Sequence, residues 1–140
     1  MSNVKVEIDS IRRPQQEIYR DKATFILKEI ASERYLPIYI SLDQADLLTK
    51  ELTHELPPGR DNPPATFLKK VNATLSDIIC ITIYQDKDIY SAKVLFYVND
   101  GPVDVKCPIG VALSLADRAQ VPILVNSEVM AKAALTVSSV

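Results

Sequence analysis

Apolar residues recur at strand spacing in the first third of the chain. Val4, Val6 and Ile8 alternate with charged residues, which predicts an opening strand with one buried face. Residues 23–30 and 35–40 are two further apolar runs separated by a short polar turn, and we expect both to be strands.

The spacing then changes to that of a helix. Ser41 is followed three residues later by Gln44, a capping-box pattern that predicts a helix start. One face of this helix carries the apolar residues Leu42, Ala45, Leu48 and Leu52. Residues 53–64 contain four prolines and no periodicity, which is typical of long loops that carry function or move. Thr66 is expected to cap a second helix.

The second half of the chain returns to strand patterns. Residues 78–84 are nearly all apolar and predict a strand covered on both faces. Asn99-Asp100-Gly101-Pro102 predicts a hairpin turn, because an Asp-Gly pair suits positive φ angles. Val103, Val105 and Cys107 are expected to form the inner face of the returning strand.

The most informative stretch is residues 107–125, CPIGVALSLADRAQVPILV. Pro108 suits the first turn of a helix, and the helix that follows has so few polar residues that it must be buried. Residues 121–125 predict a short buried strand, and Asn126 is expected to cap a last helix that ends at about Leu135.

Together these elements indicate one α+β domain over residues 1–140, with an ordered core at about residues 3–135. We expect a mixed, mostly antiparallel sheet with helices packed on it. A duplicated ββα unit is the simplest account of the order of the elements. When Ala23 is aligned with Ala92, Ser41 falls on Gly110, so that each following helix starts at an equivalent place.

Charge and composition narrow the functional classes. The 140 residues carry a formal net charge of −2, which gives no basic footprint for nucleic acid. The first residues do not have the pattern of a signal peptide, and no apolar run reaches the length of about 18 residues that a membrane span needs. We therefore expect a cytoplasmic protein without a membrane segment. Cys80 and Cys107 are expected to be reduced and buried, with a disulfide or a metal pair as the alternative.

The sequence contains no strong catalytic motif. Its three glycines exclude a phosphate-binding glycine loop. With a single histidine, any Ser-His-Asp arrangement or histidine-rich metal centre would depend on His54.

Five features in this order carry a family resemblance: the apolar run 36–40 (LPIYI), the acidic-to-apolar helix after it, the proline-containing loop, Pro108 with its Ala- and Leu-rich helix, and residues 121–125 (VPILV). Over roughly residues 23–134 the chain resembles the bifunctional nuclease family, which is named for action on both DNA and RNA. The resemblance implies a nucleic-acid substrate, a homodimer and, if the chain is active, a divalent metal such as Mg²⁺ or Mn²⁺.

The family's polar positions are changed in this chain. Members usually carry Thr-His-Asp at the start of the second helix, where this sequence has Pro64, Ala65 and Thr66. They also carry Arg-Pro-Ser-Asp where this sequence has Cys107, Pro108, Ile109 and Gly110, so that only the proline remains. The replaced types would suit metal-dependent phosphodiester hydrolysis. Alternatively, the Ser-Asp pair serves only to cap the helix and the arginine holds the aspartate.

Other residues could replace the missing set. His54, Glu55 and Asp61 are the weak catalytic candidates in the proline-rich loop, although solvated loop residues are the default interpretation. Arg60 is a candidate for binding a substrate or anion, as are the helix-start residues Ile109 and Gly110 with their backbone N–H groups. A neighbouring loop or water is the alternative partner of those N–H groups. No set of residues in the sequence predicts a metal site.

Three functions therefore remain open: a divergent nuclease with weak activity, a non-catalytic homodimeric module for binding or assembly, and a regulatory domain that binds a small molecule or anion beside Gly110. Whether the chain is an enzyme stays undecided at this point.

Overall fold

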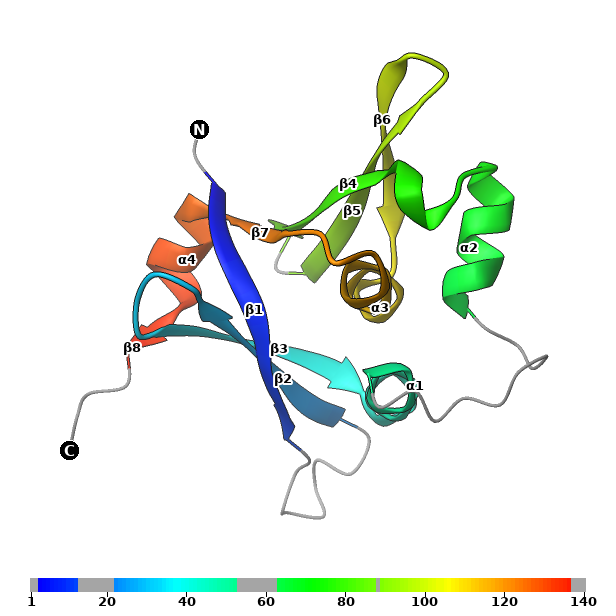
Figure 1. Cartoon of the computed structure of the whole chain (residues 1–140). Coiled ribbons are helices and arrows are strands. Elements are labelled where there is room, and N and C mark those ends of the chain that lie inside the picture. The colour runs from blue at the N-terminus through cyan, green and yellow to red at the C-terminus, as the bar shows by residue number, and fades with distance from the viewer. Residues whose placement is uncertain (1–2, 13–21, 53–62, 88, 137–140) are drawn as a thin grey trace.

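The computed structural model describes residues 3–12, 22–52, 63–87 and 89–136, which fold into one mixed sheet with helices packed on it (Figure 1). The strands are β1 (Asn3–Arg12), β2 (Lys22–Glu29), β3 (Arg34–Ser41), β4 (Ile78–Asp86), β5 (Ile89–Val98), β6 (Gly101–Cys107), β7 (Ile123–Asn126) and β8 (Leu135–Thr136). The helices are α1 (Leu42–Leu52), α2 (Pro63–Val71), α3 (Ile109–Ala119) and α4 (Ser127–Ala133), with a short 3-10 turn η2 (Leu75–Asp77) before β4.

The strands lie in the order β6-β5-β4-β7-β1-β2-β3-β8. Neighbours are antiparallel except for β4 and β7, which run parallel because the chain crosses over through α3 between the β5–β6 hairpin and β7. This confirms the α+β class and the mixed, mostly antiparallel sheet. The hairpins β2–β3 and β5–β6 are each followed by a helix, α1 and α3; an internal duplication stays a prediction.

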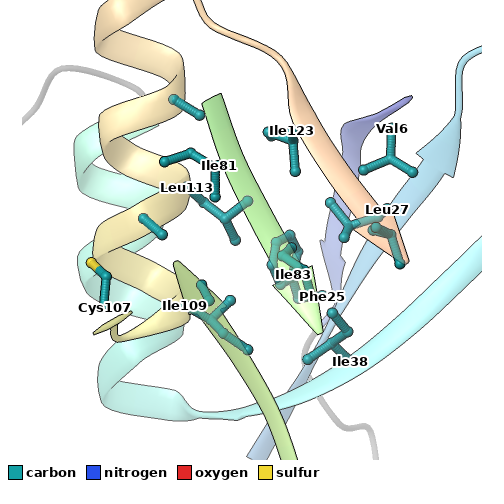
Figure 2. Close-up of a cluster of buried hydrophobic side chains, with 14 of the residues drawn as sticks. Val6, Phe25, Leu27, Ile38, Ile81, Ile83, Cys107, Ile109, Leu113 and Ile123 are labelled. Carbon is teal, nitrogen blue, oxygen red and sulfur yellow. The ribbon is translucent and has the colours of Figure 1, made fainter. Parts of the chain in front are cut away.

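Helix α3 forms the centre of the molecule. Its residues Ile109 to Ala116 are all buried, and it contacts α1, α2, β4 and β5. Figure 2 shows the side chains of Ile109 and Leu113 beside Ile81 and Ile83 of β4. The one buried polar side chain in this segment, Ser114, donates to the carbonyl oxygen of Gly110 at 3.0 Å, so its hydroxyl is satisfied. The burial expected from the apolar sequence is thus confirmed.

Strand details differ from the sequence-based expectations. Residues 78–84 are not covered on both faces throughout, because a β-bulge between Ile78 and Cys80 leaves Ile79 43% exposed. Val103 is also 43% exposed, since β6 is an edge strand, and of the three residues expected on its inner face Cys107 alone is fully buried. The hairpin turn uses Asn99 and Asp100, with φ angles of 50° and 65°, and Gly101 already belongs to β6.

Two helix boundaries also differ. Helix α2 begins at Pro63, so Thr66 lies inside its first turn and does not cap it, because prolines are well suited to that turn. Asn126 caps α4 as expected, with its Oδ1 accepting from the N–H of Glu128 at 2.8 Å. The helix ends at Ala133, earlier than expected, and Leu135 pairs with Tyr35 in the strand pair β3–β8.

Candidate functional site

The site residues suggested by the sequence fall into two groups. His54, Glu55, Arg60 and Asp61 lie outside the described residues, and their roles stay predictions. Ile109 and Gly110 open α3 and are both buried. The site that can be built from the structure is therefore the one at the start of α3.

A cleft of about 440 Å³ lies at this helix start. It is lined by Tyr39 and Ile40 of β3, Ile89, Tyr90 and Ser91 of β5, and Cys107, Pro108 and Ile109 at the β6–α3 junction. Four strands separate β3 from β5 in the sheet order. Because both strands line one cleft, the sheet must curl, and α3 begins where its two halves approach each other.

The backbone at the start of α3 explains why the helix begins there. Pro108 takes the N-cap position, one residue earlier than the first-turn position expected from the sequence. Its carbonyl oxygen accepts from the N–H of Ala112 at 2.9 Å, and no side chain caps the helix. The N–H groups of Ile109, Gly110 and Val111 precede the first intrahelical bond and have no partner within the helix.

Gly110 leaves space at this end of the helix. A Cβ atom built on Gly110 would meet no heavy atom within 4 Å, although the residue is buried. The position at which the resemblance implies an aspartate therefore has open space for a side chain.

Burial changes the pKa of two groups that line the cleft, the Cys107 thiol and the Tyr90 hydroxyl. It raises the pKa of the Cys107 thiol to about 12 and raises the pKa of the Tyr90 hydroxyl. The Cys107 thiol is consequently protonated at neutral pH, which makes it a poor nucleophile and a poor metal ligand. The described lining residues include no Asp, Glu, His, Lys or Arg. Within this part of the chain the cleft is suited to apolar and aromatic contacts.

The second place at which the resemblance implies polar residues lies on α2. Pro64 is buried in the first turn of α2, and Thr66, two residues further on in the same turn, is exposed. Neither these residues nor Ala65 line the cleft at α3. The structure thus does not bring the two family positions together into one described site.

A divalent metal does not fit the described residues at these two positions. Cysteine with a raised pKa, proline, isoleucine and glycine offer none of the carboxylate oxygens that Mg²⁺ or Mn²⁺ prefers. Across residues 3–12, 22–52, 63–87 and 89–136, no group of three His, Cys, Asp or Glu side chains could hold a metal ion.

A protein-family model matches the part of the chain that contains the residues of the cleft. The bifunctional nuclease domain matches residues 25–138, which include β3, α1, α2 and all elements of the second half. The chain belongs to the bifunctional nuclease domain family. No curated protein matches it. Among the described helices of this family member, none is long and apolar enough to span a lipid bilayer.

Sequence reasoning missed a larger concavity on another part of the domain. A groove of about 810 Å³ runs along β1 and reaches the C-terminal end of α3. Its lining includes the carboxylates Glu7, Asp9 and Asp117. The alternation of Glu7 and Asp9 with apolar residues was visible in the sequence, but their proximity to Asp117 depends on long-range pairing of strands.

Proposed function

We propose that this chain is a divergent member of the bifunctional nuclease family in which metal-dependent hydrolysis of DNA or RNA is weak or lost, and that it acts as a homodimeric binding module. The observation that carries the proposal is the apolar and aromatic lining of the cleft at the start of α3. The chain's two cysteines, Cys80 and Cys107, are buried and form no disulfide, which suits a reducing compartment such as the cytoplasm.

The chemistry of the lining supports binding over hydrolysis. Phosphodiester hydrolysis draws on a metal-bound or base-activated water and on cations that pair with the phosphate. Pro108 and Ile109 have no ionisable group, and the Cys107 thiol keeps its proton because burial raises its pKa to about 12. A cleft of about 440 Å³ with two tyrosines is instead within the usual size range of ligand sites and favours a flat, uncharged group.

The rim of the cleft supports assembly with a second copy. Tyr39 is 72% exposed and Ile89 is 66% exposed, and both lie at this cleft. Neighbouring exposed apolar residues often mark interaction sites, and a twofold dimer can bury such a surface on both partners. Light scattering at micromolar concentration should therefore give about twice the monomer mass of 15.6 kDa. The double variant Tyr39→Lys, Ile89→Lys should shift the protein to monomer, and a monomeric wild type would refute assembly.

A nuclease assay tests the loss of catalysis. Highly purified protein is incubated with labelled single-stranded DNA or RNA and with Mg²⁺ or Mn²⁺. We expect no cleavage above a buffer control for the wild type. Restoring the family residue types with Ala65→His, Thr66→Asp, Ile109→Ser and Gly110→Asp should increase cleavage if these positions are catalytic.

A second assay tests the catalytic candidates in the proline-rich loop, His54, Glu55 and Asp61. The triple variant His54→Ala, Glu55→Ala, Asp61→Ala is compared with Asp86→Ala, which removes an exposed carboxylate at the β4–β5 turn. Cleavage by the wild type that the Asp86→Ala variant keeps and the triple variant loses would show an active site in residues 53–62, and the proposed loss of activity would then be wrong.

A further inference from the structure

Strand β1 has an open edge inside the sheet. It pairs with β2 as far as Arg12, but it pairs with β7 only over Asn3 to Val6. Beyond Val6, the side of β1 that faces β7 has no strand partner among the described residues. An unpaired edge of this kind is a template for an additional strand.

The residues before β7 explain why the pairing stops. The carbonyl oxygen of Pro122 accepts from the N–H of Ile81 at 3.0 Å, so the chain is held against β4 at this point. The N–H of Val121 bonds to the carbonyl oxygen of Ala116 at 3.2 Å, which turns the preceding residues into the end of α3. The chain therefore leaves β1 just beyond Val6.

This departure leaves the backbone of Ile8 without a partner on that side among the residues that the structure describes. The N–H of Ile30 donates to the carbonyl oxygen of Lys5 at 3.0 Å, so Lys5 directs its carbonyl toward β2. Backbone groups alternate along a strand, so Val6 and Ile8 direct theirs to the opposite side. Val6 is in register with Ile123 there, whereas no backbone bond from Ile8 to a described residue is present on that side.

The groove of about 810 Å³ lies along this edge. Ile8, Ile11 and Val121 form an apolar part of its lining. The lining also contains three carboxylates, those of Glu7, Asp9 and Asp117. None of the described lining residues is Lys, Arg or His.

The nearest strand neighbour does not neutralise these acids. Lys28 is in register with Glu7, but its Nζ donates to the carbonyl oxygens of Glu29 and Ser32 at 3.1 and 3.2 Å. No ion pair is present between Lys28 and Glu7, two residues that the structure describes.

We propose that the open edge of β1 binds an extended, basic segment of a partner protein as an added strand. The backbone of the segment would pair with Ile8, its alternate apolar side chains would contact Ile11 and Val121, and its Lys or Arg side chains would lie near Glu7, Asp9 and Asp117. Charge complementarity selects this occupant. Pairing of β1 with β1 of a second copy would bring like charges together across the strands, which is unfavourable. Nucleic acid would be repelled by the same carboxylates.

The test uses the full chain and a labelled, end-blocked peptide of about seven residues in which valine and lysine alternate, a length that matches an ordinary strand. Fluorescence anisotropy at low salt measures binding, and amide hydrogen exchange locates it. We expect the peptide to bind and to slow exchange of the Ile8 amide, whereas a peptide with glutamate in place of lysine should not bind.

Charge reversal provides the matched controls. The variant Glu7→Lys, Asp9→Lys should weaken binding about tenfold or more, because two favourable charge pairs become unfavourable. The variant Asp86→Lys, Asp104→Lys changes the net charge equally at exposed positions of β4 and β6 and should bind as the wild type does.

Three results would overturn the proposal. The first is equal binding by both double variants, the second is binding that leaves exchange at Ile8 unchanged, and the third is protection of Ile8 by self-association before peptide is added. Circular dichroism and thermal unfolding of each variant establish that a lost signal does not come from unfolding.

Discussion

Substitution of Gly110 tests the geometry at the start of α3 most directly. Glycine within a helix is less favourable than alanine by about 0.5–1 kcal/mol, because it loses more backbone freedom on folding. A methyl group at Gly110 would meet no heavy atom within 4 Å, so steric overlap does not offset this gain. We expect Gly110→Ala to raise the free energy of unfolding by about 1 kcal/mol.

Thermal and urea unfolding measure this gain, which corresponds to a rise in Tm of about 3–4 °C for a chain of this size. Gly101→Ala is the matched control, because a Cβ atom there also meets nothing within 4 Å but Gly101 lies in strand β6. A clear loss of stability in Gly110→Ala would refute the open space described at this helix start.

Gly110→Asp then tests whether a carboxylate at this position would serve to cap the helix. A carboxylate there could accept from the unpartnered N–H groups of the first turn and complement the helix dipole, gaining about 0.5–2 kcal/mol. Desolvation of a buried charge opposes this gain and costs several kcal/mol when no cation pairs with it. We expect Gly110→Asp to be less stable than Gly110→Ala at pH 7 and to recover stability as the carboxyl group is protonated at lower pH. Equal stability at pH 7 would show that the position is open to solvent.

Three further outcomes are expected. The hydrogen bond and ion pair with Arg34 lower the pKa of the Glu29 carboxyl group to about 2, so the stability it contributes is complete above about pH 4.5 and is lost as the pH falls through 2. Because solvent screens this partly exposed pair, Glu29→Gln should cost about 0.5–1 kcal/mol at pH 7 in chemical unfolding and reduce the loss of stability at acid pH. Cys107 should react with iodoacetamide at pH 8 at least about 100-fold more slowly in the native than in the unfolded chain, as peptide mapping would show. Asn126→Ala should cost about 1 kcal/mol, and Asn126→Asp should restore it.

Local patterns in the sequence predict most of the fold because they depend on neighbouring residues. The alternation at Val4, Val6 and Ile8 and the apolar helix from Ile109 both appear as expected. The bulge that exposes Ile79 and the strand β8 could not be predicted in this way, because each depends on a partner strand distant in sequence. Pairing between strands distant in sequence determines both the bulge and β8.

The candidate site follows the same division. The sequence shows that the start of α3 lacks the polar residues that the resemblance implies there, but the approach of Tyr39 and Ile89 to it requires the curl of the sheet. The open edge at Ile8 was missed because an alternating strand predicts one buried face and says nothing about which neighbours it has. The short length of residues 121–125 was the available signal, since it limits how far a strand can pair.

The two surfaces lie at opposite ends of one rigid element. Ile109 at the start of α3 lines the cleft, whereas Ala116 and Asp117 near its end line the groove beside β1. The helix has 11 residues and is therefore about 16 Å long, and its buried segment separates the two sites. None of the described residues lines both concavities, so substitutions at Glu7 and Asp9 should not alter the proposed dimerisation through the cleft, and substitutions at Tyr39 and Ile89 should not alter the proposed peptide binding. A change in both properties from either double variant would indicate that the cleft and the groove are coupled through α3.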